Sequence, residues 1–193
     1  MFSDTKNLIE LTLNSVGLVF FDPDVLENFV KKNNLSGDLF ESFQQQPEVG
    51  DEAIKAGVLI PVYSIPPLDY QILLSEGHKP RINEEWIKFI TPALPLVSTS
   101  GKVVVSDIDA IMDWDYSFYR SLEHTKLKQP YNAFMIDPGI FSVKIVGFCE
   151  TKWTGSGPIN KGYELLFDKT DTLLKVNENV DSDSINYIVY GEL

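Results

Sequence analysis

The sequence has little cysteine and little histidine, and both shortages exclude kinds of site. Cys149 is the only cysteine in 193 residues, so no disulfide can form within the chain, which favours a reducing compartment. A metal site built on imidazoles would need His78 and His124 to meet, with carboxylates completing it, and their spacing does not indicate this. We therefore expect no metal and no other cofactor.

Basic residues are also scarce relative to acidic ones. Lysine and arginine total 16 against 28 aspartates and glutamates, so the formal net charge is −12. Binding to a phosphate backbone rests on basic side chains, so this balance argues against a nucleic-acid-binding protein and against docking on an anionic membrane. A negative field instead favours cationic protein partners. Solubility alone would also account for the charge.

Long apolar runs are missing as well. No stretch approaches the roughly 18 apolar residues that a membrane span needs. The first residues carry Asp4 and Glu10 where a signal peptide is uncharged or positive. We therefore expect a cytoplasmic protein.

What is present is enough apolar material for a core, since hydrophobic residues make up 44% of the chain and aromatic residues 12%. The patterns predict a single α+β domain over residues 1–193, with a largely antiparallel β-sheet or sandwich and a few helices concentrated in the N-terminal half. The expected helices span 22–34, 37–46, 51–57 and 83–92. The expected strands span 8–13, 17–21, 58–65, 69–75, two segments within 94–107, 131–137, 140–150, 163–168, 172–176 and 185–193.

Three local signals support these assignments. Asn14 and Ser15 separate the first two strands, so we expect a hairpin there. Asp22 before Pro23 is a favoured start for a helix. In the strand 140–150, alternation predicts that Cys149 shares an apolar face with Phe141, Val143 and Ile145.

The stretch DIDAIMDWDYSFYR, residues 107–120, concentrates acidic and aromatic side chains. It does not match a calcium loop, because Ile111 stands where the next ligand should be and the central glycine is missing. The pattern predicts a short helix capped by Asp107 or Asp109, with solvated acids outside and Ile108, Ile111 and Met112 facing the core. The functional alternative is a partner-binding surface, because interfaces favour aromatic residues. That surface would comprise Asp107, Asp109, Asp113, Trp114, Asp115, Tyr116 and Tyr119.

No catalytic residues are expected. The chain has no G-x-S-x-G nucleophile elbow, and a Cys149–His dyad would place the thiol on the apolar face of a strand. The glycine-rich stretch 153–162 lacks the P-loop pattern and precedes a strand rather than a helix. A pair of carboxylates for glycoside hydrolysis stays open, because acids are abundant. Residue chemistry thus indicates a protein that is not an enzyme.

Two stretches carry a resemblance to a known kind of protein. TLNSVGLVFFDPDVLENF, residues 12–29, joins a strand to a helix capped by Asp-Pro, and NAFMIDPGIFSVKIVGFCE, residues 132–150, places Pro-Gly between two strands. Together they resemble small bacterial toxin-immunity proteins, from uncharacterised families beside secreted nucleases and other toxins. The resemblance implies a cytoplasmic inhibitor that binds one cognate toxin, and it transfers no functional residue.

The sequence therefore predicts a non-catalytic acidic binding protein, most simply an immunity protein that inhibits a bacterial toxin by stoichiometric binding. Acidic side chains would meet the basic cleft of the partner, and aromatic side chains would anchor it. One alternative is a small-molecule-binding β-rich domain or an unrecognised hydrolase, with a pocket lined by Trp86, Trp153 and Tyr163. Another is a structural subunit of a larger assembly.

Overall fold

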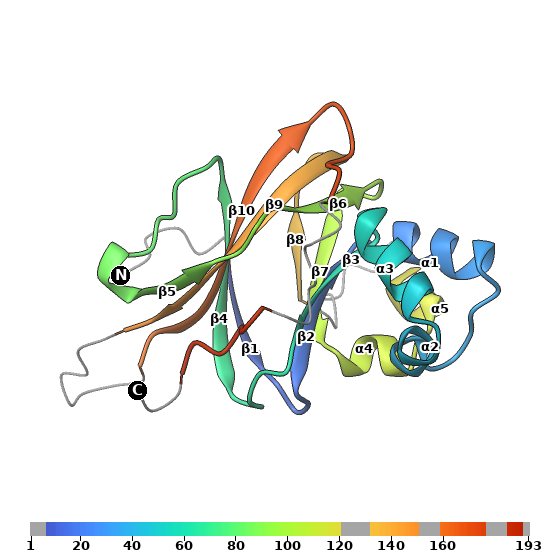
Figure 1. Ribbon diagram of the computed structural model, residues 1–193, viewed down its shortest axis with the longest axis horizontal. Helices are drawn as coiled ribbons and strands as arrows, with labels where there is room; N and C mark the ends of the chain where they lie inside the picture. The colour runs from blue at the N-terminus through green and yellow to red at the C-terminus, as the bar shows by residue number, and fades with distance from the viewer. Residues whose placement is uncertain (1–6, 121–131, 151–158, 177–184, 191–193) are drawn as a thin grey trace.

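Two β-sheets and a layer of helices are stacked in the computed structural model, which describes residues 7–120, 132–150, 159–176 and 185–190 (Figure 1). The large sheet has six strands in the order β1-β4-β10-β9-β5, with β6 also paired to β9. The small sheet has four strands in the order β3-β2-β7-β8 and lies between the large sheet and the helices (Figure 1). The fold class is therefore α+β, as the sequence predicts.

The large sheet is antiparallel except at one pair of strands. It comprises β1 (Leu8–Thr12), β4 (Asp69–Glu76), β5 (Ile87–Ile90), β6 (Leu94–Ser98), β9 (Gly139–Cys149) and β10 (Lys161–Thr170). β4 and β10 run parallel. Their backbones approach so closely that a Cβ atom at Gly162 would lie 1.8 Å from the carbonyl oxygen of Gln71. Only glycine fits at this position of β10.

The small sheet is buried on both faces. It comprises β2 (Gly17–Phe21), β3 (Leu59–Tyr63), β7 (Lys102–Asp107) and β8 (Asn132–Met135), all antiparallel. In β2, Leu18 and Phe20 face the large sheet, whereas Val19 and Phe21 face the helices. This explains why β2 is apolar at every position instead of alternating.

The helices cover the outer face of the small sheet (Figure 1). They are α1 (Pro23–Lys32), α2 (Leu39–Gln45), α3 (Pro47–Lys55), α4 (Asp109–Met112) and α5 (Tyr116–Arg120). The predicted start of α1 is confirmed, because Asp22 Oδ1 accepts hydrogen bonds from the backbone amides of Asp24 and Val25. Most of the helical residues lie in the N-terminal half of the chain, again as predicted.

The main core lies between the two sheets. Phe141, Val143, Ile145 and Cys149 share one face of β9 there, which confirms the alternation seen in the sequence. Val103 and Val105 of β7 enter the same core from the small sheet. Burial of apolar side chains on this scale is the dominant favourable term for folding.

The first predicted hairpin is wrong, although both of its strands exist. β1 pairs with β4 in the large sheet, whereas β2 pairs with β3 and β7 in the small sheet. The same crossing occurs at 99–101, between β6 and β7, and at 136–138, between β8 and β9. Each turn thus passes the chain from one sheet to the facing sheet, which buries one face of both strands in the shared core.

Three further assignments need correction. Residues 83–92 form a single 3₁₀ turn, η2 (Glu84–Trp86), followed by β5, instead of a helix. Pairing of β5 with β9 outweighs the helix-start signals, because it partly buries the alternate residues Ile87 and Phe89. Residues 172–176 and the described part of 185–193, residues 185–190, are not strands. No helix among the described residues is long and apolar enough to cross a membrane.

Candidate functional site

The acidic stretch 107–120 folds as the end of β7 followed by α4 and α5. Ile108 and Ile111 are buried as predicted, but Met112 is 40% exposed and does not face the core. The predicted cap is wrong: the N-cap residue of α4 is Ile108, with no side-chain cap hydrogen bond, and the buried Asp107 is the last residue of β7. The residues of the predicted partner-binding surface therefore divide into an inward-facing and an outward-facing group.

Asp107 joins two turns of the chain. Its carboxylate accepts hydrogen bonds from the backbone amides of Asn14 at 2.6 Å and Ser15 at 3.0 Å, and from the Ser15 hydroxyl. It also accepts one from the backbone amide of Asp109 at 3.3 Å. Burial alone would raise its pKa, but the hydrogen bonds from Ser15, Asn14 and Asp109 outweigh burial and hold the pKa below its ordinary value. Asp107 therefore stabilises the fold by accepting hydrogen bonds from within the chain.

Three of the four aromatic residues of the stretch contact the core or α1, whereas Phe118 is exposed. Tyr119 is buried, stacks on Trp114 with ring centroids 5.3 Å apart and meets the edge of Phe21. The Trp114 indole nitrogen donates a hydrogen bond to Glu27 of α1 at 3.0 Å. The Tyr116 hydroxyl hydrogen-bonds Asp24 of α1 at 2.9 Å. These contacts attach α4 and α5 to α1. Because Asp107 and Tyr119 are buried, they do not belong to a docking surface.

Three predicted residues remain on the outside, namely Asp109, Asp113 and Asp115. Asp115 accepts a hydrogen bond from the backbone amide of Ser117 at 2.8 Å. The side chain and the amide of Ser117 lower the pKa of this fully exposed carboxyl. Beside these acids, Trp114 and Tyr116 are partly exposed. We call Asp109, Asp113, Trp114, Asp115 and Tyr116 the acidic patch.

Negative charge is concentrated in the helical layer as a whole. Residues 22–57 contain eight carboxylates and three lysines, and residues 107–120 contain four carboxylates and one arginine. Together these segments carry −8 of the net charge of −12. Because the helices lie on one side of the sheets, the charge of the molecule is strongly asymmetric (Figure 1).

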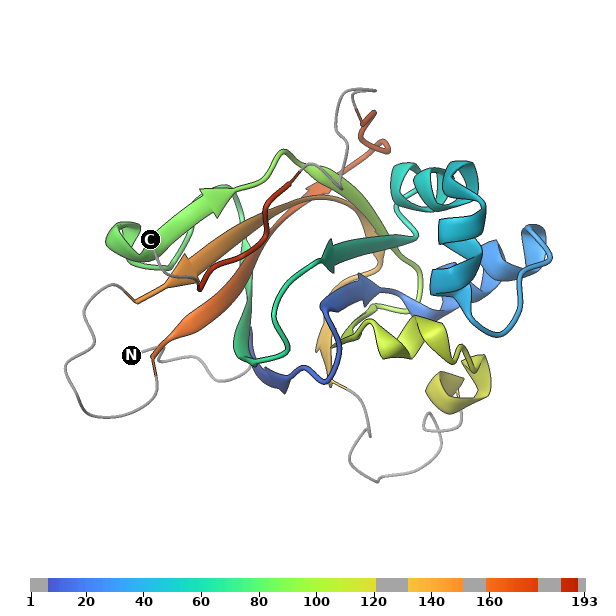
Figure 2. The ribbon, with the colours of Figure 1, turned by 60° about the horizontal axis from the view of Figure 1, so that its bottom comes forward.

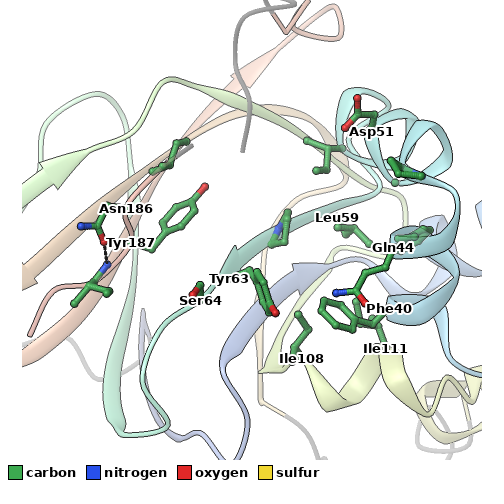
Figure 3. Close-up of a pocket in the computed structure, with 17 residues that line it drawn as sticks. Phe40, Gln44, Asp51, Leu59, Tyr63, Ser64, Ile108, Ile111, Asn186 and Tyr187 are labelled. Atoms are coloured by element: carbon green, nitrogen blue, oxygen red, sulfur yellow. Dashed lines mark hydrogen bonds between the residues drawn. The ribbon is translucent and has the colours of Figure 1, made fainter. Parts of the chain in front are cut away.

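Beside the helical layer, a cavity of about 720 Å³ opens along β3 (Figure 3). We call it the β3 groove. Its walls are α2 and α3 on one side and residues 185–188 on the other, with Ile108 and Ile111 at its floor near α4. The Tyr163 hydroxyl donates a hydrogen bond to the Tyr187 carbonyl at 2.9 Å and so attaches the second wall to β10.

The lining of the β3 groove is mostly apolar with a few polar groups. Phe40, Phe43 and Tyr63 provide aromatic rings, and Phe40 and Tyr63 lie with ring centroids 5.3 Å apart. The Gln44 amide points into the groove from α2 (Figure 3). Ser64 follows β3 at the mouth with a φ of 62°. The volume and the lining both fall in the range of ligand-binding pockets.

The pocket expected from the sequence does not form. Tyr163 faces the core between the sheets, whereas Trp86 packs against Leu73, Ile82 and Phe148 on the opposite face of the large sheet. Trp153 lies outside the described residues. The sequence contained one signal for the β3 groove, because Leu39, Phe40 and Phe43 share a helix face; Leu39 is fully buried, but the two phenylalanines are only partly covered. The remaining walls come from distant segments.

Two buried titratable side chains, Cys149 and Glu164, are part of the packing and hydrogen bonding of the fold. Cys149 is buried in the core, and burial raises the pKa of its thiol. Buried Glu164 accepts hydrogen bonds from the Ser75 hydroxyl and from the backbone amides of Arg81 and Ile82, and so fixes the loop after β4. Within residues 7–120, 132–150, 159–176 and 185–190, no three acidic, histidine or cysteine side chains are grouped to hold a metal ion. His124 and most of the stretch 153–162 lie outside these ranges.

Comparison with known proteins yields one weak structural similarity. No family model and no curated protein matches the chain. A solved structure described as "Crocagin biosynthetic gene J" is similar with a TM-score of 0.46 and 13% sequence identity, over 83% of this chain and 94% of that one. A similarity at this level supports no conclusion about activity, so the functional argument depends on the geometry and charge described above.

Proposed function

We propose that the chain is a non-catalytic binding protein of the cytoplasm that holds a basic protein in a stoichiometric complex. Following the sequence resemblance, the partner would be a bacterial toxin and the chain its immunity protein. The observation that carries the proposal is the concentration of −8 of the net charge of −12 in the helical layer. Such a field attracts a positively charged surface and speeds its association.

The acidic patch is the docking surface in this proposal. Asp109, Asp113 and Asp115 are exposed on it, and the partly exposed rings of Trp114 and Tyr116 lie beside them. Contacts of these rings with α1 hold them in place before binding. Rigid aromatic groups lose little conformational entropy in a complex, which makes them suitable anchors.

The test combines affinity capture with charge reversal. The wild-type protein and the variant Asp113→Lys/Asp115→Lys are used as baits in lysates of the source cells, and bound proteins are eluted in a salt gradient and identified by mass spectrometry. Glu84→Lys/Glu85→Lys is the matched control, because it makes the same charge change at exposed residues next to the large sheet. We expect one basic protein at one-to-one ratio on the wild-type and control baits, released at high salt and lost from the Asp113→Lys/Asp115→Lys bait.

Association kinetics test whether the charge of the acidic patch speeds binding. With the purified partner, reversal of Asp113 and Asp115 should slow association at low salt by about tenfold or more, whereas the control should have a much smaller effect. An unchanged association rate would remove the acidic patch from the interface. If no basic partner is captured by the wild-type protein, the proposal fails.

A second candidate function is binding of a small molecule, and the β3 groove favours it. Its volume of about 720 Å³ is suitable for a drug-sized ligand, and its lining combines aromatic rings with the Gln44 amide and the Ser64 hydroxyl. A thermal-shift screen of apolar metabolites checks this candidate, with ligand-dependent stabilisation as the expected result. If no compound stabilises the protein, the groove does not bind a small molecule of this class.

A further inference from the structure

We propose that the β3 groove is a second binding site, which takes an extended peptide segment of a partner with apolar residues flanked by lysine or arginine. One apolar side chain would enter the groove, and the peptide backbone would pair with the free edge of β3. The site is formed by α2, α3, β3, residues 185–188 and the buried Ile108 and Ile111, and it includes no residue of the acidic patch. It therefore does not depend on the function proposed above.

One edge of β3 is unpaired among the described residues. Among the described residues β3 is the border strand of the small sheet, with β2 on its other side. The Gly17 carbonyl accepts a hydrogen bond from the amide of Ile108. The backbone N–H and C=O groups of odd-numbered β2 residues therefore point toward β7, and those of even-numbered residues point toward β3. In the β2–β3 register, Pro61 and Tyr63 oppose odd-numbered residues, so their backbone polar groups point away from β2.

This arrangement suits a peptide added as a strand. Pro61 has no N–H group, so it offers only its carbonyl to a further strand, and Tyr63 offers both its N–H and its carbonyl. Pro61 limits the pairing to a short segment, as proline commonly does on an edge strand. Peptide recognition at such an edge takes affinity from backbone hydrogen bonds and specificity from pockets for alternate side chains.

The groove also leaves apolar surface open to water. Tyr63 of β3 is 39% exposed, and Ile188, on the wall formed by residues 185–188, is 44% exposed. Phe40, Phe43 and Pro61, which also line the groove, are only partly buried. Figure 3 shows the Tyr63 ring between Phe40 of α2 and the segment that carries Asn186 and Tyr187. An aromatic or branched side chain of a peptide would cover these groups from water.

The backbone is strained at the mouth of the groove. Ser64 has a φ of 62°, a left-handed conformation that is uncommon outside glycine, asparagine and aspartate. It lines the groove directly after the last residue of β3. Strained backbone tends to persist at binding sites, where it directs polar groups toward a ligand.

Charge selects the occupant. Asp51 is the one charged side chain among the described residues that line the groove, and Glu48 and Glu52 flank it on the exposed side of α3. Asp51 pairs with Lys55 at 3.6 Å and Glu52 with Lys32 at 3.1 Å, but all four side chains are exposed, so basic residues of a peptide can still approach these carboxylates. A second copy of this chain, with its net charge of −12, and a lipid with an anionic headgroup would both be repelled.

The test uses a defined peptide, acetyl-Lys-Val-Lys-Phe-Lys-Val-Lys-amide, titrated into the full-length protein by calorimetry. We expect binding at one-to-one ratio, and slower hydrogen exchange of the Tyr63 amide in the complex. Ile188→Asn should weaken binding by about tenfold. Ile90→Asn, the same substitution at an apolar residue of β5 that is 50% exposed, should not. Thermal unfolding of both variants verifies that they are folded.

Charge and backbone pairing are tested separately. Asp51→Asn should weaken binding severalfold, whereas Asp137→Asn, at an exposed aspartate between β8 and β9, should not. Asp113→Lys/Asp115→Lys should leave the affinity unchanged, so failure of the acidic patch and failure of the groove are distinguishable. Equal binding of the peptide with glutamate in place of lysine, or with methylated backbone amides, would overturn the proposal. So would binding of the apolar dye Nile red in the groove without any binding of the peptide.

Discussion

The carboxylate of Asp107, at the end of β7, lies 2.6 Å from the backbone nitrogen of Asn14, which belongs to the connection between β1 and β2. That connection carries the chain from the large sheet to the small one. Asp22 has the same relationship to the connection between β6 and β7, where its Oδ2 accepts hydrogen bonds from the amides of Thr99 and Ser100, each at 2.9 Å. Two buried aspartates thus satisfy the amides of two crossings between the sheets.

Replacement of Asp107 by asparagine should destabilise the fold. The asparagine side chain has one oxygen that accepts hydrogen bonds, where aspartate has two. Some of the backbone amides of Asn14, Ser15 and Asp109 would therefore lose their acceptor. We expect a loss of about 1–3 kcal/mol in the free energy of unfolding, measured with urea. Asp109→Asn is the control, because Asp109 is exposed, and its effect should stay within about 0.5 kcal/mol.

The stabilisation by Asp107 should also depend on pH. Its pKa in the folded protein lies below the ordinary value of 3.8, so folding favours the ionised carboxyl. The contribution is present above the pKa of the unfolded chain and is lost as the pH falls through the lower pKa of the folded protein, in the acid region below about pH 4. Urea unfolding at several pH values should show the difference between wild type and Asp107→Asn shrinking in acid. A constant difference would contradict this linkage.

Asp22 should contribute more to stability than an ordinary helix cap. It caps α1 and also accepts hydrogen bonds from Ser98, Thr99 and Ser100 while fully buried. Asp22→Ala should therefore cost about 2–4 kcal/mol in urea unfolding. Asp38→Ala removes a cap alone, since Asp38 accepts from the amide of Glu41 at the start of α2, and should cost about 1 kcal/mol. Equal losses would show that the link between α1 and the 99–101 connection contributes nothing.

Tyr119 and its neighbour Phe118 should differ sharply in their contribution to stability. Tyr119 is buried between Phe21 and Trp114, whereas Phe118 is 43% exposed. Tyr119→Ala should lower the free energy of unfolding by about 3–5 kcal/mol, and Phe118→Ala by about 1 kcal/mol or less. Thermal and urea unfolding would measure both. A small loss for Tyr119→Ala would mean that this ring is not part of the core beneath α4 and α5.

Local signals predicted much of the fold because their physical cause is local. Asp22 and Pro23 begin a helix wherever a helix can pack, and alternation in β9 places Cys149 with Phe141 in the core. The segment at 83–92 shows where this reasoning fails. Asn83 accepts a hydrogen bond from the amide of Glu85 as a cap does, but the chain continues into β5, because β9 offers a partner strand that no local pattern reveals.

The candidate site was less predictable than the fold. The sequence pattern of an aromatic residue next to an acidic one is the same whether the aromatic side chain faces solvent or an adjacent helix. The polar atoms of Trp114 and Tyr116 form hydrogen bonds with Glu27 and Asp24, which lie in a distant segment of the chain, and Tyr119 is buried against Phe21. For the same reason the β3 groove, whose walls join α2 and α3 to residues 185–188, had only a partial signal in the sequence, namely the apolar face of α2.

The sequence by itself determined the α+β class, the start of α1, the apolar faces of the strands and the excess of negative charge, because these depend on composition or on patterns within a few residues. The third helix begins at Pro47, four residues before its predicted start. Only the tertiary structure decided which sheet each strand joins, because a turn such as Asn14-Ser15 reverses the chain equally well within a sheet or between two facing sheets. It also decided which acids are buried and which surfaces remain open. Those outcomes depend on contacts between residues far apart in the chain, such as Asp107 and Asn14.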